Sequence, residues 1–538
     1  MKNEITQLLR EIAELLELKG ENPFKARAYT NAADIIADRN IDIVGKVNDD
    51  TIREVEGIGE ALQQKLTEFV KTGRLEYYEK LKAEIPPEMI AISRIKGVGA
   101  KKAKALVETH KIQSLEELEM MAENGELAKL KGFGEKSALQ ILDSINESKE
   151  YIGKFRLDTA YTYAQEIIDI LKQTESISKV IATGELRRWL EIIETLDFVV
   201  IPSDMADLQT KLNVDYDIKV HPNLITFDYK KIPVKLHIAD EDNFGLISHN
   251  LSCSEQYLEI FNDVAKNTFA HKNNYFYDSD KKISLPTEQS VYEKLTMQYV
   301  EPETREDGQA IQYAITSDLP KLIEESDMKG MLHCHSTWSD GVNTIEEMAL
   351  ESKRLGYTYF AITDHSKTAV YANGLSPKRV LEQHKEIDEL NAKDLGIKIL
   401  KGIESDILND GSLDYDEEIL SQFDLVVASV HSNFTMSKNE MTDRVIRALM
   451  SPYTTILGHP TGRILLRRKG YEIDQKAVID AAAEYKVIIE INANPYRLDL
   501  DWRLLGYAKQ KGVKIAINPD AHSLKGLQQV KYGIHIAR

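Results

Sequence analysis

The chain has 538 residues, 42% of them hydrophobic, and a formal net charge of −19 at neutral pH. This length predicts about three or four domains with substantial cores. The negative charge argues against a broad, sequence-blind attraction to nucleic acid, although local basic patches could still hold a phosphate. Two cysteines, Cys253 and Cys334, exclude a disulfide framework and favour a reducing compartment.

Residues 1–20 show a helical apolar period interrupted by acidic residues. Neither a signal peptide nor a membrane span is expected from this pattern, and we predict a cytoplasmic protein. The helical pattern continues to about residue 150.

This helical region contains three turns of the form glycine, apolar residue, glycine. They are Gly57-Ile-Gly59, Gly97-Val-Gly99 and Gly132-Phe-Gly134. Glycine lets the backbone approach a phosphate closely, and the amides at the next helix start carry partial positive charge. Full charges follow at Lys101, Lys102, Lys104 and Lys136. The set predicts helix-hairpin-helix motifs that bind the DNA backbone, with ordinary glycine-containing turns as the alternative.

The middle of the chain mixes strands and helices. Apolar runs at residues 179–184, 196–201 and 233–238 are predicted to be strands of one sheet, with helical segments before and after them. We therefore expect an α+β module.

From residue 328 to residue 538, apolar strands alternate with helices. The first strands are Met331-Leu332 and Tyr359–Thr363, and the last is Lys514–Ile517. This alternation predicts a parallel α/β barrel, in which functional residues lie at the C-terminal ends of the strands.

Nearly every predicted strand of this barrel ends in a histidine or a carboxylate. In chain order these residues are His333, His335, Asp340, His365, Glu404, His431, His459, Asp520 and His522. So many nitrogen and oxygen ligands exceed the needs of one tetrahedral ion and suit two or three divalent ions with bridging carboxylates. A hydrogen-bonded structural histidine is the alternative for any single position, but the recurrence at strand ends favours a metal site.

Short segments around these residues resemble the polymerase and histidinol phosphatase (PHP) domain. The matching segments are HCHSTWSDG, ITDHS, GIESDI, SVHS, GHPTGR and NPDAH. The resemblance implies a distorted (β/α)7 barrel, a trinuclear centre with those nine residues as ligands, and phosphoester hydrolysis. Asp364 is expected to orient ligands rather than bind metal. Arg463 is a candidate phosphate clamp, with a surface salt bridge as the alternative.

Upstream, residues 16–29, the glycine turns and Gly184-Glu-Leu-Arg-Arg188 resemble the bacterial family X DNA polymerases. This resemblance implies five consecutive regions. They are a helical DNA-binding domain at 1–150, a nucleotidyltransferase-like palm at 151–240, a thumb-like region at 241–315, a linker at 316–327 and a PHP phosphoesterase domain at 328–538.

The palm departs from the family pattern, which is Gly-Ser-x-Arg-Arg, then Asp-x-Asp, then a third Asp. The chain retains Gly184, Arg187, Arg188 and Asp197. It has Glu185 for the serine, Thr195 for the first aspartate, Lys235 for the third, and Asn250–Ser254 for a nucleotide-binding Tyr-Phe-Thr-Gly-Ser. Polymerisation needs carboxylates that hold two magnesium ions. We therefore predict that magnesium does not support polymerisation and that the palm remains as a scaffold or DNA-positioning module.

The resemblance implies a DNA-repair-type 3′–5′ exonuclease, with cleavage at abasic sites as a second activity. We expect three divalent ions per PHP site, drawn from zinc, manganese or iron. The expected partner is gapped, 3′-ended or single-stranded DNA. We expect the protein to be a monomer and not to bind a membrane. The alternatives are a working repair polymerase with a proofreading PHP domain, a PHP phosphatase of a small phosphate ester, and non-catalytic DNA binding.

Overall fold

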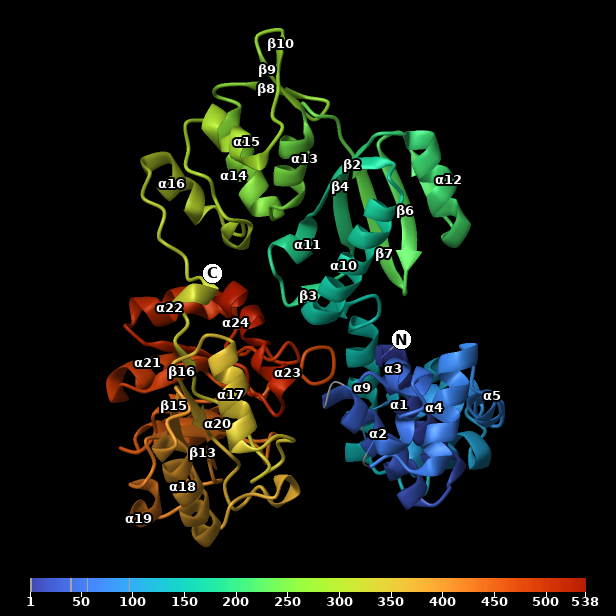
Figure 1. Ribbon diagram of the computed structural model, residues 1–538, viewed down its shortest axis with the longest axis vertical. Coiled ribbons are helices and arrows are strands. Elements are labelled where there is room, and N and C mark those ends of the chain that lie inside the picture. Colours follow the sequence, from blue (N-terminus) through green and yellow to red (C-terminus); the bar gives the residue numbers. More distant parts are fainter. Residues whose placement is uncertain (1, 39–40, 56, 96) are drawn as a thin grey trace. The chain divides into compact units, whose positions relative to one another are not determined.

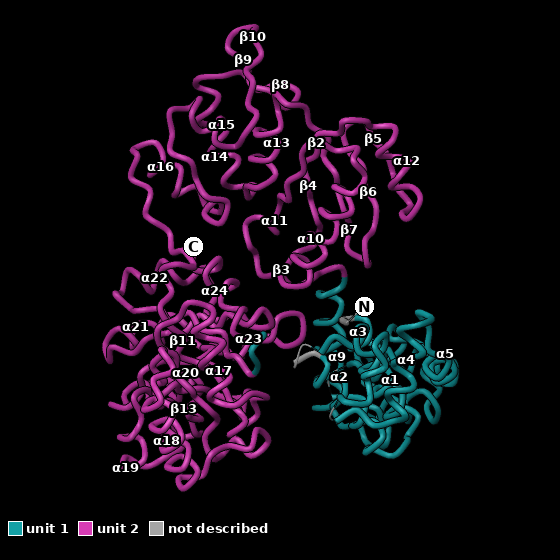
Figure 2. Tube along the Cα trace, in the orientation of Figure 1, with its two compact units in different colours: residues 1–152, 523–525 teal, residues 153–522, 526–538 magenta. Residues whose placement is uncertain are grey.

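The computed structural model describes residues 2–38, 41–55, 57–95 and 97–538. The chain divides into two compact units (Figure 2). Unit 1 comprises residues 1–152 and 523–525, and unit 2 comprises residues 153–522 and 526–538. None of the described helices combines the length and the apolar character that crossing a bilayer requires.

Unit 1 is helical, as predicted. Its helices are α1 (Lys2–Lys19), α2 (Pro23–Asp38), α3 (Ile43–Asn48), α4 (Glu60–Thr72), α5 (Glu76–Ala83), α6 (Pro87–Ser93), α7 (Gly99–Lys104), α8 (Leu115–Glu123) and α9 (Glu135–Glu150). Leu9, Ile12 and Leu16 recur at helical spacing on α1 and are almost fully buried in a common core with Ile36 and Leu66. The apolar period seen in the sequence thus forms the core of this unit.

Unit 2 begins with a five-stranded sheet in the order β2-β4-β7-β6-β5. The strands are β2 (Ile177–Ala182), β4 (Leu196–Pro202), β5 (Lys219–His221), β6 (Leu224–Tyr229) and β7 (Ile232–Ile238). The flanking helices include α10 (Leu157–Gln173), α11 (Gly184–Arg187) and α12 (Met205–Asp215). Strands β4 and β7 are parallel neighbours, and their register places Asp197 opposite Lys235. The three apolar runs predicted to be strands of one sheet therefore are β2, β4 and β7.

A mostly helical segment follows this sheet. Its elements are α13 (Phe244–Leu251), α14 (Glu255–Ala265), β8 (Ala270–Lys272), β9 (Tyr275–Asp278), β10 (Lys281–Ile283), α15 (Glu288–Lys294) and α16 (Gln309–Thr316). Tyr257, Phe261 and Tyr292 fill its own core, and the guanidinium of Arg305 is buried against the carboxylate of Glu288 at 2.8 Å. A buried charge requires such a partner.

The C-terminal part of unit 2 is a seven-stranded parallel sheet in sequential order, as predicted (Figure 1). Its strands are β11 (Gly330–Met331), β12 (Tyr359–Ile362), β13 (Lys398–Asp406), β14 (Leu425–Ser429), β15 (Ile456–Leu457), β16 (Ile488–Asn492) and β17 (Ile515–Asn518). The intervening helices include α17 (Ile345–Arg354), α18 (Pro377–Ala392), α19 (Glu417–Leu420), α20 (Lys438–Leu449), α21 (Gln475–Tyr485) and α22 (Leu505–Gln510), and α23 (Leu524–Leu527) and α24 (Val530–Ala537) follow.

The first and last strands of this sheet also approach each other. Residues just beyond β11 and β17 form a parallel bridge between Cys334 and Ala521, and the amide of His335 donates to the carbonyl of Ala521 at 2.8 Å. The sheet is therefore a nearly closed barrel, and this closure brings His335 beside His522.

The barrel and the five-stranded sheet share one hydrophobic core within unit 2. Trp189 stacks on His535 with ring centroids 3.6 Å apart, and Glu191 accepts hydrogen bonds from Trp502 and Arg503. These contacts attach the C-terminal helix α24 and the segment before α22 to the segment between α11 and β4.

Candidate metal centre

The nine histidines and carboxylates predicted from the sequence all lie at one end of the barrel. They follow the C-terminal ends of β11, β12, β14, β15 and β17, or, for Glu404, lie near the end of the long strand β13. Parallel strands bring their carboxyl ends to the same edge, so side chains far apart in the sequence meet there.

Glu404 is the centre of this cluster. Its Oε1 lies 3.0 Å from His459 Nε2, 3.1 Å from His431 Nε2 and 3.4 Å from His333 Nε2. Its Oε2 lies 3.0 Å from His365 Nδ1 and 3.7 Å from His335 Nε2. One buried carboxylate that faces five imidazoles is arranged as a bridging ligand would be.

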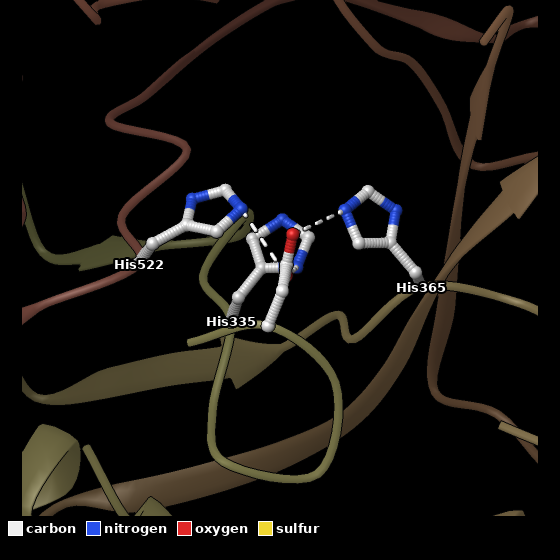
Figure 3. A group of neighbouring side chains, drawn as sticks. His335, His365 and His522 are labelled. Atoms are coloured by element: carbon white, nitrogen blue, oxygen red, sulfur yellow. Dashed lines mark ion pairs between the residues drawn. The ribbon is translucent and has the colours of Figure 1, made fainter. Parts of the chain in front are cut away.

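Two further carboxylates complete the cluster. Asp340 lies 3.4 Å from His522 Nε2, 3.6 Å from His365 Nε2 and 3.8 Å from His335 Nδ1. Figure 3 shows the rings of these three histidines pointing toward one another from separate segments of the chain. Asp520 Oδ1 lies 3.2 Å from His335 Nε2 and 3.6 Å from His333 Nε2.

The cluster fits divalent cations. Three overlapping groups of side chains each bring donor atoms within 4.8 Å of one another: His335 with Asp340, His365 and His522; His333 with His335 and Asp520; and His365 with Glu404 and His431. Within the described part of the chain, five buried imidazole nitrogens of this cluster have no hydrogen-bond partner. They are His333 Nε2, His335 Nδ1 and Nε2, His365 Nδ1 and His459 Nδ1. Buried nitrogens without partners are costly unless a ligand binds them.

The charges of the cluster differ from ring to ring. Burial opposes protonation of His333, His365 and His431, but the neighbouring carboxylates outweigh it and raise the pKa of each ring, so these rings must release a proton when they bind a metal. Burial lowers the pKa of His335 to about 3, helped by His522 and His365, so this ring is neutral, as a metal ligand must be. Burial opposes ionisation of Glu404, but His431, His333 and His365 outweigh it and hold the pKa of this carboxyl well below its usual value. Glu404 is therefore an anion at neutral pH.

Two more carboxylates orient the histidines, and the sequence interpretation missed both. Glu490 Oε1 lies 2.7 Å from His333 Nδ1, and its Oε2 accepts from the His459 amide at 2.8 Å. Asp406 Oδ1 lies 2.5 Å from His431 Nδ1. Carboxylates in these positions fix the tautomer and direction of a ligand imidazole. A signal for both existed, since Glu490 interrupts an apolar strand and Asp406 follows Glu404 at the two-residue period of a strand face.

Asp364 supports the loop that carries His335 and Asp340. Its buried carboxylate accepts hydrogen bonds from Ser336 N at 2.8 Å, from Ser336 Oγ and Gln383 Nε2 at 2.6 Å each, and from Ser339 Oγ. Burial raises the pKa of Asp364 in spite of these donors. The side chain therefore holds the loop, and its role in orienting metal ligands stays a prediction.

Two arginines, Arg463 and Arg497, lie near the cluster and have different contacts. The Arg463 guanidinium donates to the carbonyls of Arg497 and Leu498 and pairs with Asp501 at 3.0 Å. The structure thus favours the salt bridge over the phosphate clamp for Arg463. Arg497, which this contact supports, places its Nε 3.7 Å from Asp520 Oδ2. No sequence signal marked Arg497.

The residues predicted to belong to a palm form a second polar group, between β4 and β7. Asp197 Oδ2 accepts from Thr195 Oγ1 at 2.5 Å, and its Oδ1 lies 2.8 Å from His237 Nε2. Burial opposes ionisation of Asp197, but these two contacts and the charge of Lys235 outweigh it and lower the pKa of this carboxyl. Both oxygens of the retained aspartate are therefore engaged inside the protein.

The other motif residues of the palm also have internal partners. Arg187 pairs with Glu288 at 2.7 Å, and Arg188 pairs with Glu306 at 2.6 Å. Glu185 accepts from the amide of Glu194 at 2.8 Å, and burial raises the pKa of its carboxyl. Gly184 adopts a φ of +70°, with Asp197 atoms 3.4 Å from the position of a Cβ.

The three glycine turns of unit 1 are alike at their first and middle residues. The first glycines have φ values of +86° at Gly57, +89° at Gly97 and +93° at Gly132. The middle residues, Ile58, Val98 and Phe133, are buried. Around the second glycines, Gly59, Gly99 and Gly134, the described residues leave open space where a Cβ would lie, and α4, α7 and α9 begin there. This leaves the start of each helix accessible to a phosphate.

The lysines beside the second turn differ from each other. Lys101 is exposed, whereas Lys102 Nζ donates to the Gly97 carbonyl at 2.8 Å and to Ser137 Oγ at 3.3 Å. Lys102 therefore joins the second and third turns, and Lys101 is the one whose charge faces solvent.

Comparisons with known proteins match both ends of the chain. Residues 1–75 match a helix-hairpin-helix domain, residues 89–147 match a SAM-like helix-hairpin-helix tandem, and residues 331–494 match the PHP domain. The whole chain is 35% identical to the DNA polymerase/3′-5′ exonuclease PolX of Bacillus subtilis and covers 95% of it. About 35% of the chain is 32% identical to a probable phosphatase of Caldanaerobacter subterraneus, of which it covers 74%.

Proposed function

Since the chain belongs to the family X DNA polymerases that carry a C-terminal PHP domain, we propose that it is a metal-dependent 3′–5′ exonuclease whose palm no longer polymerises. DNA is held by the helical hairpins, and the phosphodiester bond is cut at the barrel. Cleavage at abasic sites is proposed as a second activity of the same centre. The protein acts as a cytoplasmic monomer on gapped, 3′-ended or single-stranded DNA.

The observation that carries this proposal is the cluster around Glu404. A buried carboxylate that touches five imidazoles, beside five buried nitrogens without hydrogen-bond partners, suits cations rather than a hydrogen-bonded core. We propose that the nine predicted residues bind three ions of zinc, manganese or iron. Bound divalent ions supply an activated water and stabilise charge on a phosphoryl group.

The surrounding side chains prepare the site for a phosphodiester. Glu490 and Asp406 hold His333 and His431 in the ligand orientation. Asp364 fixes the loop with His335 and Asp340 through three hydrogen bonds, and a fourth, from Gln383, ties it to α18. Arg497 is proposed to face the anionic substrate, because its guanidinium lies at the edge of the cluster near Asp520.

The palm contacts support the loss of polymerisation. Magnesium in this position requires open carboxylate oxygens, whereas Asp197 already binds Thr195 and His237 and has Lys235 opposite it. The arginines of the nucleotide-binding motif are paired with Glu288 and Glu306. A working polymerase, the activity in the name of the Bacillus relative, is therefore the second candidate.

A phosphatase of a small ester is the third candidate. The relatives named probable phosphatases match only the barrel part of this chain. The two helix-hairpin-helix regions and their accessible turns favour a nucleic-acid substrate over a small ester.

The test uses the full chain, a 5′-labelled single-stranded oligonucleotide and either manganese or zinc. We expect a ladder of products shortened from the 3′ end, lost in His335→Ala and retained in His221→Ala, because His221 is exposed on β5 outside the cluster. Equal cleavage by the wild type and His335→Ala would contradict the proposed site. Release of phosphate from small esters without cleavage of DNA would favour the phosphatase.

A further inference from the structure

The loop between β12 and α18 displays two large side chains that the metal cluster does not use. Val370 is 82% exposed and Tyr371 is 72% exposed, whereas the neighbouring Ala369 and Ala372 are buried. The two alanines anchor the turn, and the two larger residues project from it. Exposed side chains of this size are common singly, but an adjacent pair beside a polar site calls for an explanation.

The loop itself is held rigidly. The amide of Leu375 donates to the His365 carbonyl at 2.8 Å, and the amide of Gly374 donates to the Ala369 carbonyl at 3.1 Å. A Cβ on Gly374 would lie 1.9 Å from the Ser366 carbonyl oxygen, so the two sides of the loop are in close contact. Val370 and Tyr371 are therefore presented in a fixed position.

This exposed pair lies beside the metal cluster. The loop begins at His365, and the Tyr371 ring centroid is 6.1 Å from the His365 ring centroid. A substrate whose phosphodiester reaches His365 and Asp340 would bring its neighbouring group over Tyr371. That group must be largely apolar and flat to gain from contact with a valine and an aromatic ring.

We infer that Val370 and Tyr371 form a stacking platform for the base of the 3′-terminal nucleotide. The inference rests on the proposed exonuclease function and deepens it, since it names the part of the substrate that the barrel itself recognises. Aromatic rings stack on every base, so the platform accepts any sequence and binds a terminus that lacks a base more weakly. Val370 and Tyr371 are positioning residues rather than members of the metal set.

The test compares two oligonucleotides that differ only at the 3′ end, one with a normal nucleotide and one with a tetrahydrofuran abasic analogue. Tyr371→Ala should raise KM for the normal terminus by about 5- to 150-fold, as expected for base–aromatic stacking. KM for the abasic terminus and both kcat values should change less than about twofold. Tyr371→Trp should retain the wild-type preference, because it keeps an aromatic face.

Tyr485→Ala is the matched control. Tyr485 is also exposed, but it ends α21 just before β16 begins, so it lies at the opposite end of the barrel from the cluster. An equal effect of Tyr371→Ala on both oligonucleotides, or no effect, would overturn the platform and leave the exonuclease intact. If the wild-type protein shortened neither of the two oligonucleotides, the proposed function and the platform would both be overturned.

Discussion

Unit 2 contains two polar groups, one between β4 and β7 in the predicted palm and one at the C-terminal end of the barrel, and they differ in how their polar atoms are satisfied. In the palm, the oxygens of Asp197 already bind Thr195 and His237. In the barrel, Glu404 faces five imidazoles, and several ring nitrogens lack protein partners in the described chain. Polar atoms that are hydrogen-bonded within the protein indicate a scaffold, whereas buried polar atoms without a hydrogen-bond partner indicate a ligand site.

The largest expected effect comes from breaking the barrel cluster. His365→Ala removes a ring that contacts Glu404 at 3.0 Å and Asp340 at 3.6 Å. Hydrolysis should fall by about a thousandfold or more, because the activated water depends on bound cations. DNA affinity, measured by fluorescence anisotropy, should stay within about twofold. A variant that retains wild-type hydrolysis would place the chemistry elsewhere.

Smaller losses are expected from the carboxylates that orient the histidines. Glu490→Gln and Asp406→Asn should each reduce metal affinity or activity by about 10- to 100-fold. Asp410→Asn is the matched control. Asp410 lies just after β13, is exposed, and accepts hydrogen bonds from the amide and the hydroxyl of Ser412. The measurements are metal content by mass spectrometry and kcat for oligonucleotide hydrolysis. Unchanged metal content and kcat in Glu490→Gln would contradict the orienting role of Glu490.

The glycine turns should affect DNA binding but not the chemistry. Gly97→Ala and Gly132→Ala place a Cβ at φ values of +89° and +93°, which costs about 1–2 kcal/mol of local conformation. We expect DNA affinity to fall by about tenfold, with cleavage of saturating DNA unchanged. Gly125→Ala is the control, because Gly125 also has a positive φ, +76°, and open space but belongs to none of the three turns. Equal losses in all three variants would indicate a general effect on folding.

The palm should give the smallest effect on activity. Asp197→Asn should leave hydrolysis within about twofold and reduce stability by about 1–3 kcal/mol, because it weakens two buried hydrogen bonds. The folded pKa of Asp197 is lowered, so its contribution is present above the unfolded pKa of about 3.9 and disappears as the pH falls through the folded pKa. The thermal unfolding midpoint of Asp197→Asn should therefore be lower than that of the wild type at pH 6, and the difference should diminish toward pH 3. A difference that stays constant with pH would contradict this role of Asp197.

Much of this contrast could be predicted from the sequence. The family and the general fold were confirmed, and the nine barrel residues meet at one end because each lies near or beyond the C-terminal end of an apolar strand. The resemblance to the family X pattern identified Thr195 and Lys235 as the residues that stand where that pattern has aspartates. Metal binding by the nine barrel residues and the loss of metal binding in the palm stay predictions.

The missing parts depend on three-dimensional packing. Arg463 lies in a conspicuous motif, yet its guanidinium folds back on Asp501 and two carbonyls, whereas Arg497 reaches the cluster without any motif. The sequence likewise could not show that Lys102 donates to the Gly97 carbonyl; its contact with DNA stays a prediction. Sequence spacing predicts which strand end a residue occupies, but not which partner a long side chain chooses.

The most direct test follows a single labelled primer–template with all four deoxynucleoside triphosphates and manganese. The account predicts shortening of the primer from its 3′ end, no template-directed extension, and loss of shortening in His335→Ala. Extension of the primer in His335→Ala, abolished by Asp197→Asn, would show that the palm polymerises and would contradict the central claim.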